Sequence, residues 1–275
     1  MEGRIGSRRQ SAMSDVEVAI STVGEGAEVI RRQFGTARIT VDKGGGDVAT
    51  TADLEAEAAM LAVLRRERPA DAVLGEEFGR TGRKDSVRVW LIDPLCGTQN
   101  YMAGMRVVAV NAALSRSGRV HAAAVADPFG GEIYWSDGHD SYARTEGRDV
   151  HLIPSGASRL VDLNFDPPFP NASIFRAVTL AADHAFLARF RPRVVSSSLA
   201  MTWVASGRRA AYVSDGDFRE SVHFAAGLAI CVAAGCVVSD LHGNPTAVGP
   251  YGMIVAAELG THAAIVDLVC KQFAQ

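Results

Sequence analysis

The sequence lacks the features that mark membrane proteins and nucleic-acid-binding proteins. No apolar run reaches the roughly 18 residues that a membrane helix requires. Aromatic residues make up only 7% of the chain and charged residues 21%, and the net charge is −3. A nucleic-acid-binding surface needs a basic excess, which this balance does not supply. We therefore expect neither a membrane partner nor a nucleic-acid partner.

Cysteine is also scarce. The four cysteines, at positions 96, 231, 236 and 270, form no C-x-x-C pair. Free thiols are typical of a reducing compartment, so we predict a cytoplasmic protein. The N-terminal stretch MEGRIGSRRQSAM has arginines but no apolar segment, so it does not resemble a secretory signal. We predict a disordered tail over residues 1–13, or an upstream start before Met13.

The chain is rich in glycine, with 27 residues, and 48% of its residues are hydrophobic, which suits a core packed largely from Ala and Val. Its 275 residues are enough for one large domain or two small ones. Apolar residues spaced three and four apart predict a helix over 16–34, with Ser14 or Asp15 as its cap. DKGGGD is predicted to be a loop, and the following stretch a second helix that stops at Pro69.

Runs of strand length follow, at 71–77, 87–93, 107–115, 119–127 and 132–136. The last four predict an antiparallel meander after the two helices. The pattern loosens over 150–170, and beyond it helix and strand alternate, beginning with a helix over 171–190. We predict an α/β layered fold with an N-terminal α+β lobe over 14–155 and a C-terminal α/β lobe over 156–275.

Acidic residues fall where predicted elements end. Asp53 lies at a helix start, Glu76 and Glu77 follow a strand, and Asp93 follows another. Each has a simple structural role available: Asp53 as a helix cap, and the glutamates as a solvated turn. Together with the turn Pro94–Thr98 they suggest oxygen ligands for Mg²⁺, which prefers carboxylates, carbonyls and water.

Four stretches carry a resemblance to a known family. GEE at 75–77, WLIDPLCGTQNY at 90–101 and FAAGLAICVAAGCVVSDLHG at 224–243 resemble the inositol monophosphatase family, and KGGGDVATTAD at 43–53 resembles its K-x-x-x-D-x-V-T-x-x-D segment. The family's metal loop runs W-[VIL]-I-D-P-[IL]-D-G-T-x-N-[FY], and its second signature begins W-D-x-A-A-G. The resemblance implies a five-layer αβαβα sandwich, a homodimer, a Mg²⁺ cofactor and a small phosphorylated substrate.

The resemblance also implies roles for individual residues. Glu76, Asp93, the Leu95 carbonyl and Thr98 match the first metal position, where the counterparts of Glu76 and Thr98 orient the water that attacks a phosphate monoester. Asp53 matches an outer acid that supports a further, weaker cation. Gly97 and Thr98 match the turn that holds phosphate oxygens. The stretch before the second signature has no clear match, and its Asp217 and Glu220 are candidates for substrate contacts, with a plain surface loop as the alternative.

Two departures from the family fall on one cation position. The second acid of the metal loop is Cys96, and the W-D pair is Val222-His223. Neither thiol nor imidazole suits Mg²⁺, so binding at this second position should be lost, and the Li⁺ inhibition that the family owes to it should be weak. Asp93, Cys96 and His223 instead form a zinc-like ligand set with one open position.

Cys96 and His223 also fit two roles that involve no metal ion. They are equally consistent with packing in an abandoned site, or with a nucleophile–base pair that has no orienting third group. A helix starting at His223 should keep the ring neutral and lower the pKa of the thiol. We expect an enzyme, a metal-dependent phosphatase of a small sugar, inositol or nucleoside phosphate. The alternatives are a lyase, cyclase or isomerase that uses the Asp93, Cys96 and His223 cluster, or a non-catalytic relative.

Overall fold

The computed structural model describes residues 13–36, 38–44, 47–165, 176–216, 221–245 and 252–273. The described helices are α1 (Asp15–Gln33), α2 (Thr51–Glu67), α3 (Thr98–Met102), α4 (Arg176–Ala182), α5 (His184–Arg189), α6 (Leu199–Ala205), α7 (Ala225–Ala234) and α8 (Leu259–Phe273). The described strands are β1 (Ile39–Gly44), β2 (Asp47–Thr50), β3 (Ala72–Gly75), β4 (Gly79–Thr81), β5 (Arg88–Cys96), β6 (Ala109–Arg116), β7 (Arg119–Ala126), β8 (Glu132–Ser136), β9 (Ser141–Thr145), β10 (Arg148–His151), β11 (Leu160–Leu163), β12 (Arg191–Val194), β13 (Ala211–Ser214), β14 (Val237–Ser239) and β15 (Met253–Ala256).

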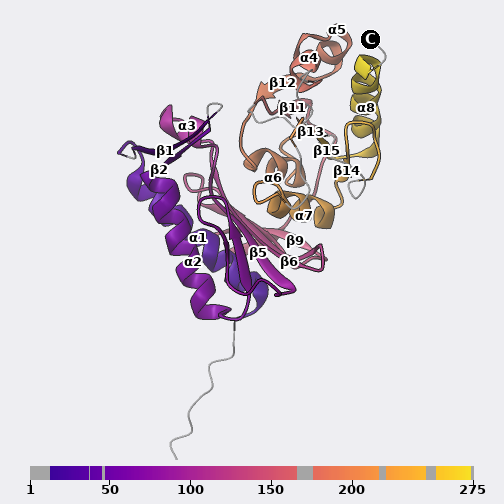
Figure 1. Ribbon diagram of the computed structural model, residues 1–275. Coiled ribbons are helices and arrows are strands. Elements are labelled where there is room, and N and C mark those ends of the chain that lie inside the picture. Colours follow the sequence, from indigo (N-terminus) through magenta and orange to yellow (C-terminus); the bar gives the residue numbers. More distant parts are fainter. Residues whose placement is uncertain are drawn as a thin grey trace, which may run out of the picture.

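These elements stack in five layers (Figure 1). Helices α1 and α2 cover one face of an eight-stranded sheet ordered β10-β9-β8-β7-β6-β5-β3-β4. Helices α6 and α7 lie between this sheet and a five-stranded sheet ordered β12-β11-β13-β15-β14. Helices α4, α5 and α8 cover the outer face of the second sheet. The predicted layered αβαβα architecture is therefore confirmed.

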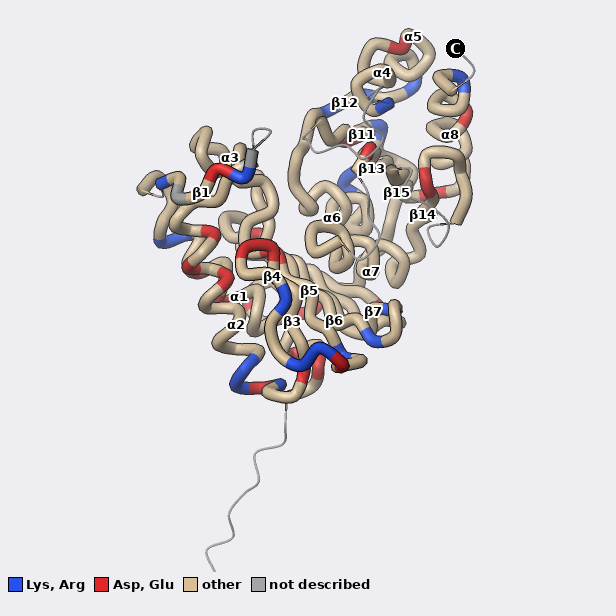
Figure 2. Tube along the Cα trace, in the orientation of Figure 1, with Lys and Arg blue, Asp and Glu red and all other residues tan. Residues whose placement is uncertain are grey.

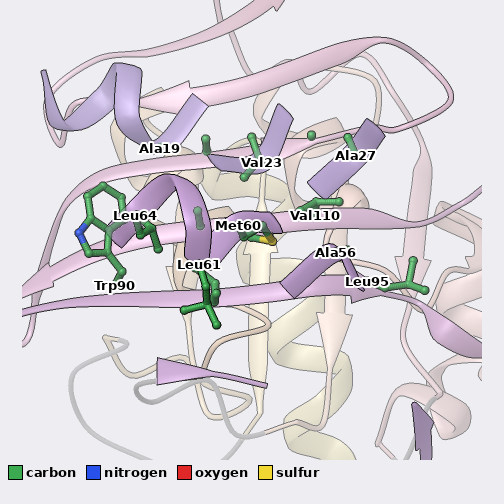
Figure 3. Packing of buried hydrophobic residues seen from close by; sticks show 14 of the residues in the cluster. Ala19, Val23, Ala27, Ala56, Met60, Leu61, Leu64, Trp90, Leu95 and Val110 are labelled. Carbon is green, nitrogen blue, oxygen red and sulfur yellow. The ribbon is translucent and has the colours of Figure 1, made fainter. Parts of the chain in front are cut away.

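Strand β5 shows how the sequence builds two cores at once. Successive side chains of a strand point to opposite faces. Trp90 and Ile92 accordingly pack in the cluster under α1 and α2, whereas Leu91 packs in the cluster that faces α6 and α7. Figure 3 shows the first cluster, with Trp90 beside Leu64 of α2. Asp93 is the next residue on the same face as Leu91, so the alternation of side chains directs its carboxylate toward the layer between the two sheets.

The first two helices begin as their sequences suggest. The Ser14 side chain accepts a hydrogen bond from the Glu17 amide, which confirms Ser14 as the cap of α1. Helix α2 is capped by Thr50, and Asp53 is the third residue of the helix in a reciprocal capping box. Asp53 therefore takes part in capping α2, which is the simple structural alternative for this residue, but the N-cap position itself is occupied by Thr50.

The predicted meander is confirmed, since β5, β6, β7 and β8 pair antiparallel in succession and β9 and β10 extend it. Two local predictions are wrong. DKGGGD is not simply a loop, because Ile39–Gly44 and Asp47–Thr50 pair as a hairpin. The described end of the helix expected over 171–190 is two short helices, because Asp183 caps α5 by accepting from the Phe186 amide.

The predicted division into lobes at 155/156 stays a prediction, although the first sheet ends at His151 and the second begins at Leu160. The predicted tail over 1–13 lies outside the described residues except for Met13. Among the described helices, none combines the length and the apolar character needed to cross a membrane.

Candidate active site

Asp93 is the centre of the site. It is fully buried near the end of β5, yet its carboxylate accepts three hydrogen bonds. The Leu95 amide donates to Oδ1 at 3.0 Å, and Asn111 Nδ2 and His223 Nδ1 contact Oδ2 at 3.3 and 2.8 Å. Hydrogen bonds to a charged group stabilise it by about 1.5–3 kcal/mol each, which makes a buried carboxylate tolerable here. The contacts come from β5, from β6 and from the residues just before α7, so the first sheet and the helix layer beside it meet at this side chain.

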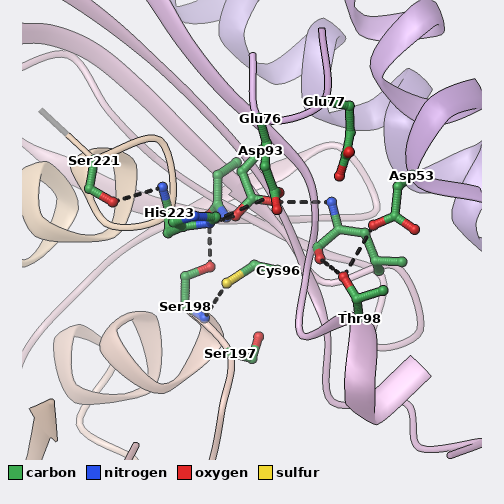
Figure 4. A network of polar contacts seen from close by, with 12 residues as sticks. Asp53, Glu76, Glu77, Asp93, Cys96, Thr98, Ser197, Ser198, Ser221 and His223 are labelled. Atoms are coloured by element: carbon green, nitrogen blue, oxygen red, sulfur yellow. Dashed lines mark hydrogen bonds and ion pairs between the residues drawn. The ribbon is translucent and has the colours of Figure 1, made fainter. Parts of the chain in front are cut away.

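Glu76 reaches the same point from the turn after β3 (Figure 4). A second, fully buried acid fixes this turn: Glu57 of α2 accepts from the amides of Glu77 and Phe78 at 2.8 and 2.9 Å. Gly75 leaves room for this carboxylate, because a Cβ there would lie 2.0 Å from Glu57 Oε1 and would displace it from the two amides. The hydrogen bonds to Glu57 therefore tie this turn to α2. Figure 2 shows the turn as an acidic segment.

His223 lies directly before α7 and approaches from the layer between the sheets. Its Nδ1 is 2.8 Å from Asp93 Oδ2 and 4.0 Å from Glu76 Oε2. Burial works against a charged ring, but the hydrogen bond and the charge of Asp93 raise the pKa of His223 to about 9. The prediction of a neutral imidazole is therefore wrong for the metal-free protein, because an adjacent carboxylate outweighs the helix dipole.

Cys96 does not join this group. The register of β5 and β6 shifts between Asp93 and Cys96, and the sulfur then faces the start of α6, where the Ser198 amide donates to it at 3.2 Å. The donor atoms that come within 4.8 Å of one another belong to Glu76, Asp93 and His223. The predicted ligand set of Asp93, Cys96 and His223 is corrected accordingly. Burial and the charge of Asp93 also raise the pKa of the Cys96 thiol, opposite to the predicted lowering.

Thr98 and Gly97 form the turn into α3. The Thr98 hydroxyl lies 3.0 Å from the Leu95 carbonyl oxygen and 3.1 Å from Asp53 Oδ1. Gly97 has φ 107°, and a Cβ there would lie 2.9 Å from the Ser196 carbonyl oxygen, so only glycine fits. The fully buried Asp53 carboxylate also accepts from the Thr50 amide and hydroxyl. These hydrogen bonds occupy both Asp53 oxygens, so its role as a ligand of a further cation stays a prediction.

Lys43 supplies positive charge at the edge of the site. Its Nζ lies 2.9 Å from Glu76 Oε1 and 2.9 Å from Glu77 Oε1. Burial disfavours the ammonium, but the two carboxylates more than offset this and raise the pKa of Lys43. Burial and the charge of Asp93 raise the pKa of Glu76 well above its ordinary value. The hairpin β1–β2 is thereby tied to the turn that carries Glu76.

The residues present fit a metal ion. Glu76 Oε2 is buried and has no hydrogen-bond partner among the described residues, although it lies beside Asp93 and His223. An orphaned carboxylate oxygen next to a second carboxylate is typical of a cation ligand. Glu76 and Asp93 could therefore hold a metal ion, with His223 as a nitrogen donor beside them, and their assignment to the first metal position stays a prediction.

Sequence reasoning located Glu76, Asp93, Leu95 and Thr98, and the structure brings them to one place. The substrate candidates Asp217 and Glu220 lie outside the described residues. Four contributors were missed as site residues: Lys43, Glu57, Asn111 and Ser198. A signal existed for Glu57, which follows Asp53 by one helical turn and is therefore an acid on a buried helix face.

Comparison with known proteins identifies the family. The model of the inositol monophosphatase family matches residues 12–273, so the chain belongs to this family. An inositol-1-monophosphatase of Mesorhizobium japonicum is 29% identical over 263 residues, which cover 93% of this chain and 96% of that protein. The Nus factor SuhB of Vibrio cholerae is 27% identical over 82% of this chain and 84% of its own. The extragenic suppressor protein suhB from Bartonella henselae shares the fold, with a TM-score of 0.81 at 21% identity, over 94% of this chain and 99% of that chain.

Proposed function

We propose that the protein is a metal-dependent phosphatase that hydrolyses the phosphate monoester of a small sugar, inositol or nucleoside. Membership of the inositol monophosphatase family supports the reaction class. The observation that carries the proposal is Glu76 Oε2, which is buried beside Asp93 and has no hydrogen-bond partner among the described residues. Thr98 begins α3 just after the strand that carries Asp93, and its hydroxyl lies 3.0 Å from the Leu95 carbonyl oxygen.

In this proposal, the residues of the chain bind the cation, orient the attacking water and accept its proton. Glu76, Asp93 and the Leu95 carbonyl would hold the cation, which supplies Lewis acidity toward water and phosphoryl oxygens. Asp53 fixes the Thr98 hydroxyl, and Thr98 with Glu76 orients the attacking water. Glu76 is the general base that takes its proton. The backbone N–H groups of Gly97 and Thr98 would hold the phosphate oxygens, as the family resemblance suggests.

The substrate contacts, the oligomeric state and the location of the enzyme are also proposals. We propose Asp217 and Glu220 as substrate contacts, and a homodimer, as the family suggests; a monomer in light scattering at micromolar concentration would contradict the dimer. The four cysteines are free, which supports a cytoplasmic location. A thiol mechanism has no support among the described residues, because the half-buried Cys96 sulfur accepts from the Ser198 amide and the pKa of its thiol is raised.

A second candidate is a family member that catalyses a lyase, cyclase or isomerase reaction on a phosphorylated substrate. The observation in its favour is the replacement of two acids at the second cation position by Cys96 and His223. Release of inorganic phosphate separates the two candidates, since only the phosphatase releases it from a monoester.

Phosphate release should be measured on a panel of inositol, sugar and nucleoside monophosphates with Mg²⁺, Mn²⁺ or Zn²⁺ supplied separately. Glu76→Gln should lower kcat by more than about a hundredfold, because it removes both the base and a charged ligand. Glu77→Gln is the matched control, an adjacent acid that also contacts Lys43 but lies outside the donor group. More than a tenth of wild-type activity in Glu76→Gln would remove Glu76 from the mechanism.

A further inference from the structure

We infer that the cation site is selective for a first-row transition-metal dication, with His223 as a third ligand beside Glu76 and Asp93, and that Zn²⁺ binds it in preference to Mg²⁺. The inference deepens the proposed function, on which it depends for the role of the site. Binding itself can be tested without any assay of activity.

The first argument is the convergence of three donors from three separate elements. Nδ1 of His223 lies 2.8 Å from Asp93 Oδ2 and 4.0 Å from Glu76 Oε2, and one donor atom of each residue lies within 4.8 Å of the others. Donors that share one ion at about 2.0–2.2 Å lie about 3–4 Å apart from one another. The three side chains therefore need only small adjustments to surround an ion.

The second argument is the state of the two oxygens of Glu76. Lys43 contacts Oε1 at 2.9 Å and so fixes the orientation of the carboxylate. Oε2 is left buried, without a hydrogen-bond partner among the described residues, on the side of Asp93 and His223. A buried acceptor without a partner is costly, and a cation held between Glu76, Asp93 and His223 would satisfy it.

The third argument is the chemistry of the set. Two carboxylates and one imidazole form a mixed oxygen and nitrogen set, which suits transition-metal dications, whereas Mg²⁺ prefers oxygen ligands throughout. Glu76, Asp93 and His223 would hold such an ion, and His223 would contribute the nitrogen ligand of the set. Cys96 is excluded from the set, because its sulfur accepts from the Ser198 amide and lies outside the donor group.

Calorimetric titration of the full, chelator-treated chain with Zn²⁺ and with Mg²⁺ tests the inference. Wild type should bind one Zn²⁺ more tightly than Mg²⁺. His223→Asp restores an all-oxygen set and should lower the Zn²⁺-to-Mg²⁺ affinity ratio by about tenfold or more. Cys96→Ser is the matched control, since the sequence pattern marks Cys96 and His223 alike as replacements of acidic metal ligands. The Zn²⁺-to-Mg²⁺ affinity ratio of this variant should stay within about threefold of wild type.

A Co²⁺ spectrum of wild type needs no variant and reports the ligand type. Nitrogen and oxygen ligation predicts weak visible bands without the intense thiolate-to-cobalt charge-transfer band in the near ultraviolet. His223→Ala, checked for folding by circular dichroism, should weaken Zn²⁺ binding and serves where His223→Asp does not fold. A thiolate band, an unchanged affinity ratio in His223→Asp, or equal affinity of wild type for both ions would each overturn the inference.

The outcomes separate this inference from the proposed function. If Mg²⁺ binds as tightly as Zn²⁺ and supports phosphate release, the inference fails and the phosphatase stands. If Zn²⁺ binds through His223 but no monoester is hydrolysed with any ion, the metal assignment stands and the phosphatase fails.

Discussion

The two halves of the candidate active site differ in the hydrogen bonds that hold their side chains in place. The carboxylate half consists of Glu76, Asp93 and Thr98, and the substituted half consists of Cys96 and His223. In the carboxylate half, each functional group is fixed by a further buried group: Glu57 holds the turn of Glu76, and Asp53 holds Thr98. Among the described residues, the substituted half has weaker support, since Cys96 accepts one amide hydrogen bond, from the buried Ser198, and the His223 ring contacts the carboxylate half itself.

This difference indicates which half can change in evolution without loss of the fold. Altering Glu57 or Thr98 would deprive backbone amides or the buried Asp53 of a hydrogen-bond partner, at a cost of about 1–3 kcal/mol each. Replacing an acid by Cys96 instead leaves a weak acceptor that a backbone amide already satisfies. Replacing an acid by His223 supplies a donor that pairs with Asp93. We therefore expect these side-chain contacts to close the second cation position and to leave the first one able to bind an ion.

Asp93→Asn should have the largest effect, because both halves depend on this carboxylate. We expect loss of measurable cation binding and a fall in kcat of more than about a hundredfold. Calorimetry and phosphate release measure the two effects. Asp162→Asn is the control, an equally buried acid on β11 that pairs with Arg209 away from the site. Cation binding that survives in Asp93→Asn would mean that the two halves do not share this ligand.

Restoring the family's acids should convert the substituted half into a second cation site. The double variant Cys96→Asp with His223→Asp should take up a second Mg²⁺, gain sensitivity to Li⁺ and show about tenfold higher Mg²⁺-supported activity. Calorimetric stoichiometry and a Li⁺ titration measure this. A double variant that folds but still binds a single cation would show that the closure involves more than these two side chains.

Breaking the support of the carboxylate half should cost stability as well as activity. Glu57→Gln replaces an oxygen by an amide donor, so one of the Glu77 and Phe78 amides loses its acceptor. We expect the free energy of unfolding to fall by about 2 kcal/mol, together with weaker cation binding. Urea denaturation measures the first effect. Glu55→Gln, on the exposed side of α2, should stay within about 0.5 kcal/mol; equal losses in both variants would refute the supporting role.

Most of the layered fold could be predicted from the sequence, because its helices and central strands have clear periodicity and its family motifs are long. The errors lie where local signals are weak or misleading. Three successive glycines in DKGGGD suggest a loop, yet the flanking residues pair as the β1–β2 hairpin. No Gly or Pro announces the break at Asp183, which arises from side-chain capping of α5.

The site could be predicted only in part, for a related reason. The motif brought Glu76 and Asp93 together because Glu76 directly follows β3 and Asp93 lies within β5, where pairing fixes the direction of the side chains. The direction of Cys96 depends on the register shift after Asp93, which no sequence spacing reveals. The charge of His223 depends on a carboxylate 130 residues away in the chain. Both are tertiary effects, and both predictions made from local helix chemistry were wrong.

Cys96→Ser should have the smallest effect of these changes. A serine oxygen can accept from the Ser198 amide as the sulfur does, and the donor group at Glu76, Asp93 and His223 does not include position 96. We expect activity within about twofold of wild type and a loss of stability below about 1 kcal/mol, the usual size for a near-isosteric change. Steady-state kinetics and urea denaturation measure both. A loss of activity above tenfold in a variant of normal stability would return the thiol to the chemistry, and the substituted half would then be a second functional centre rather than a closed one.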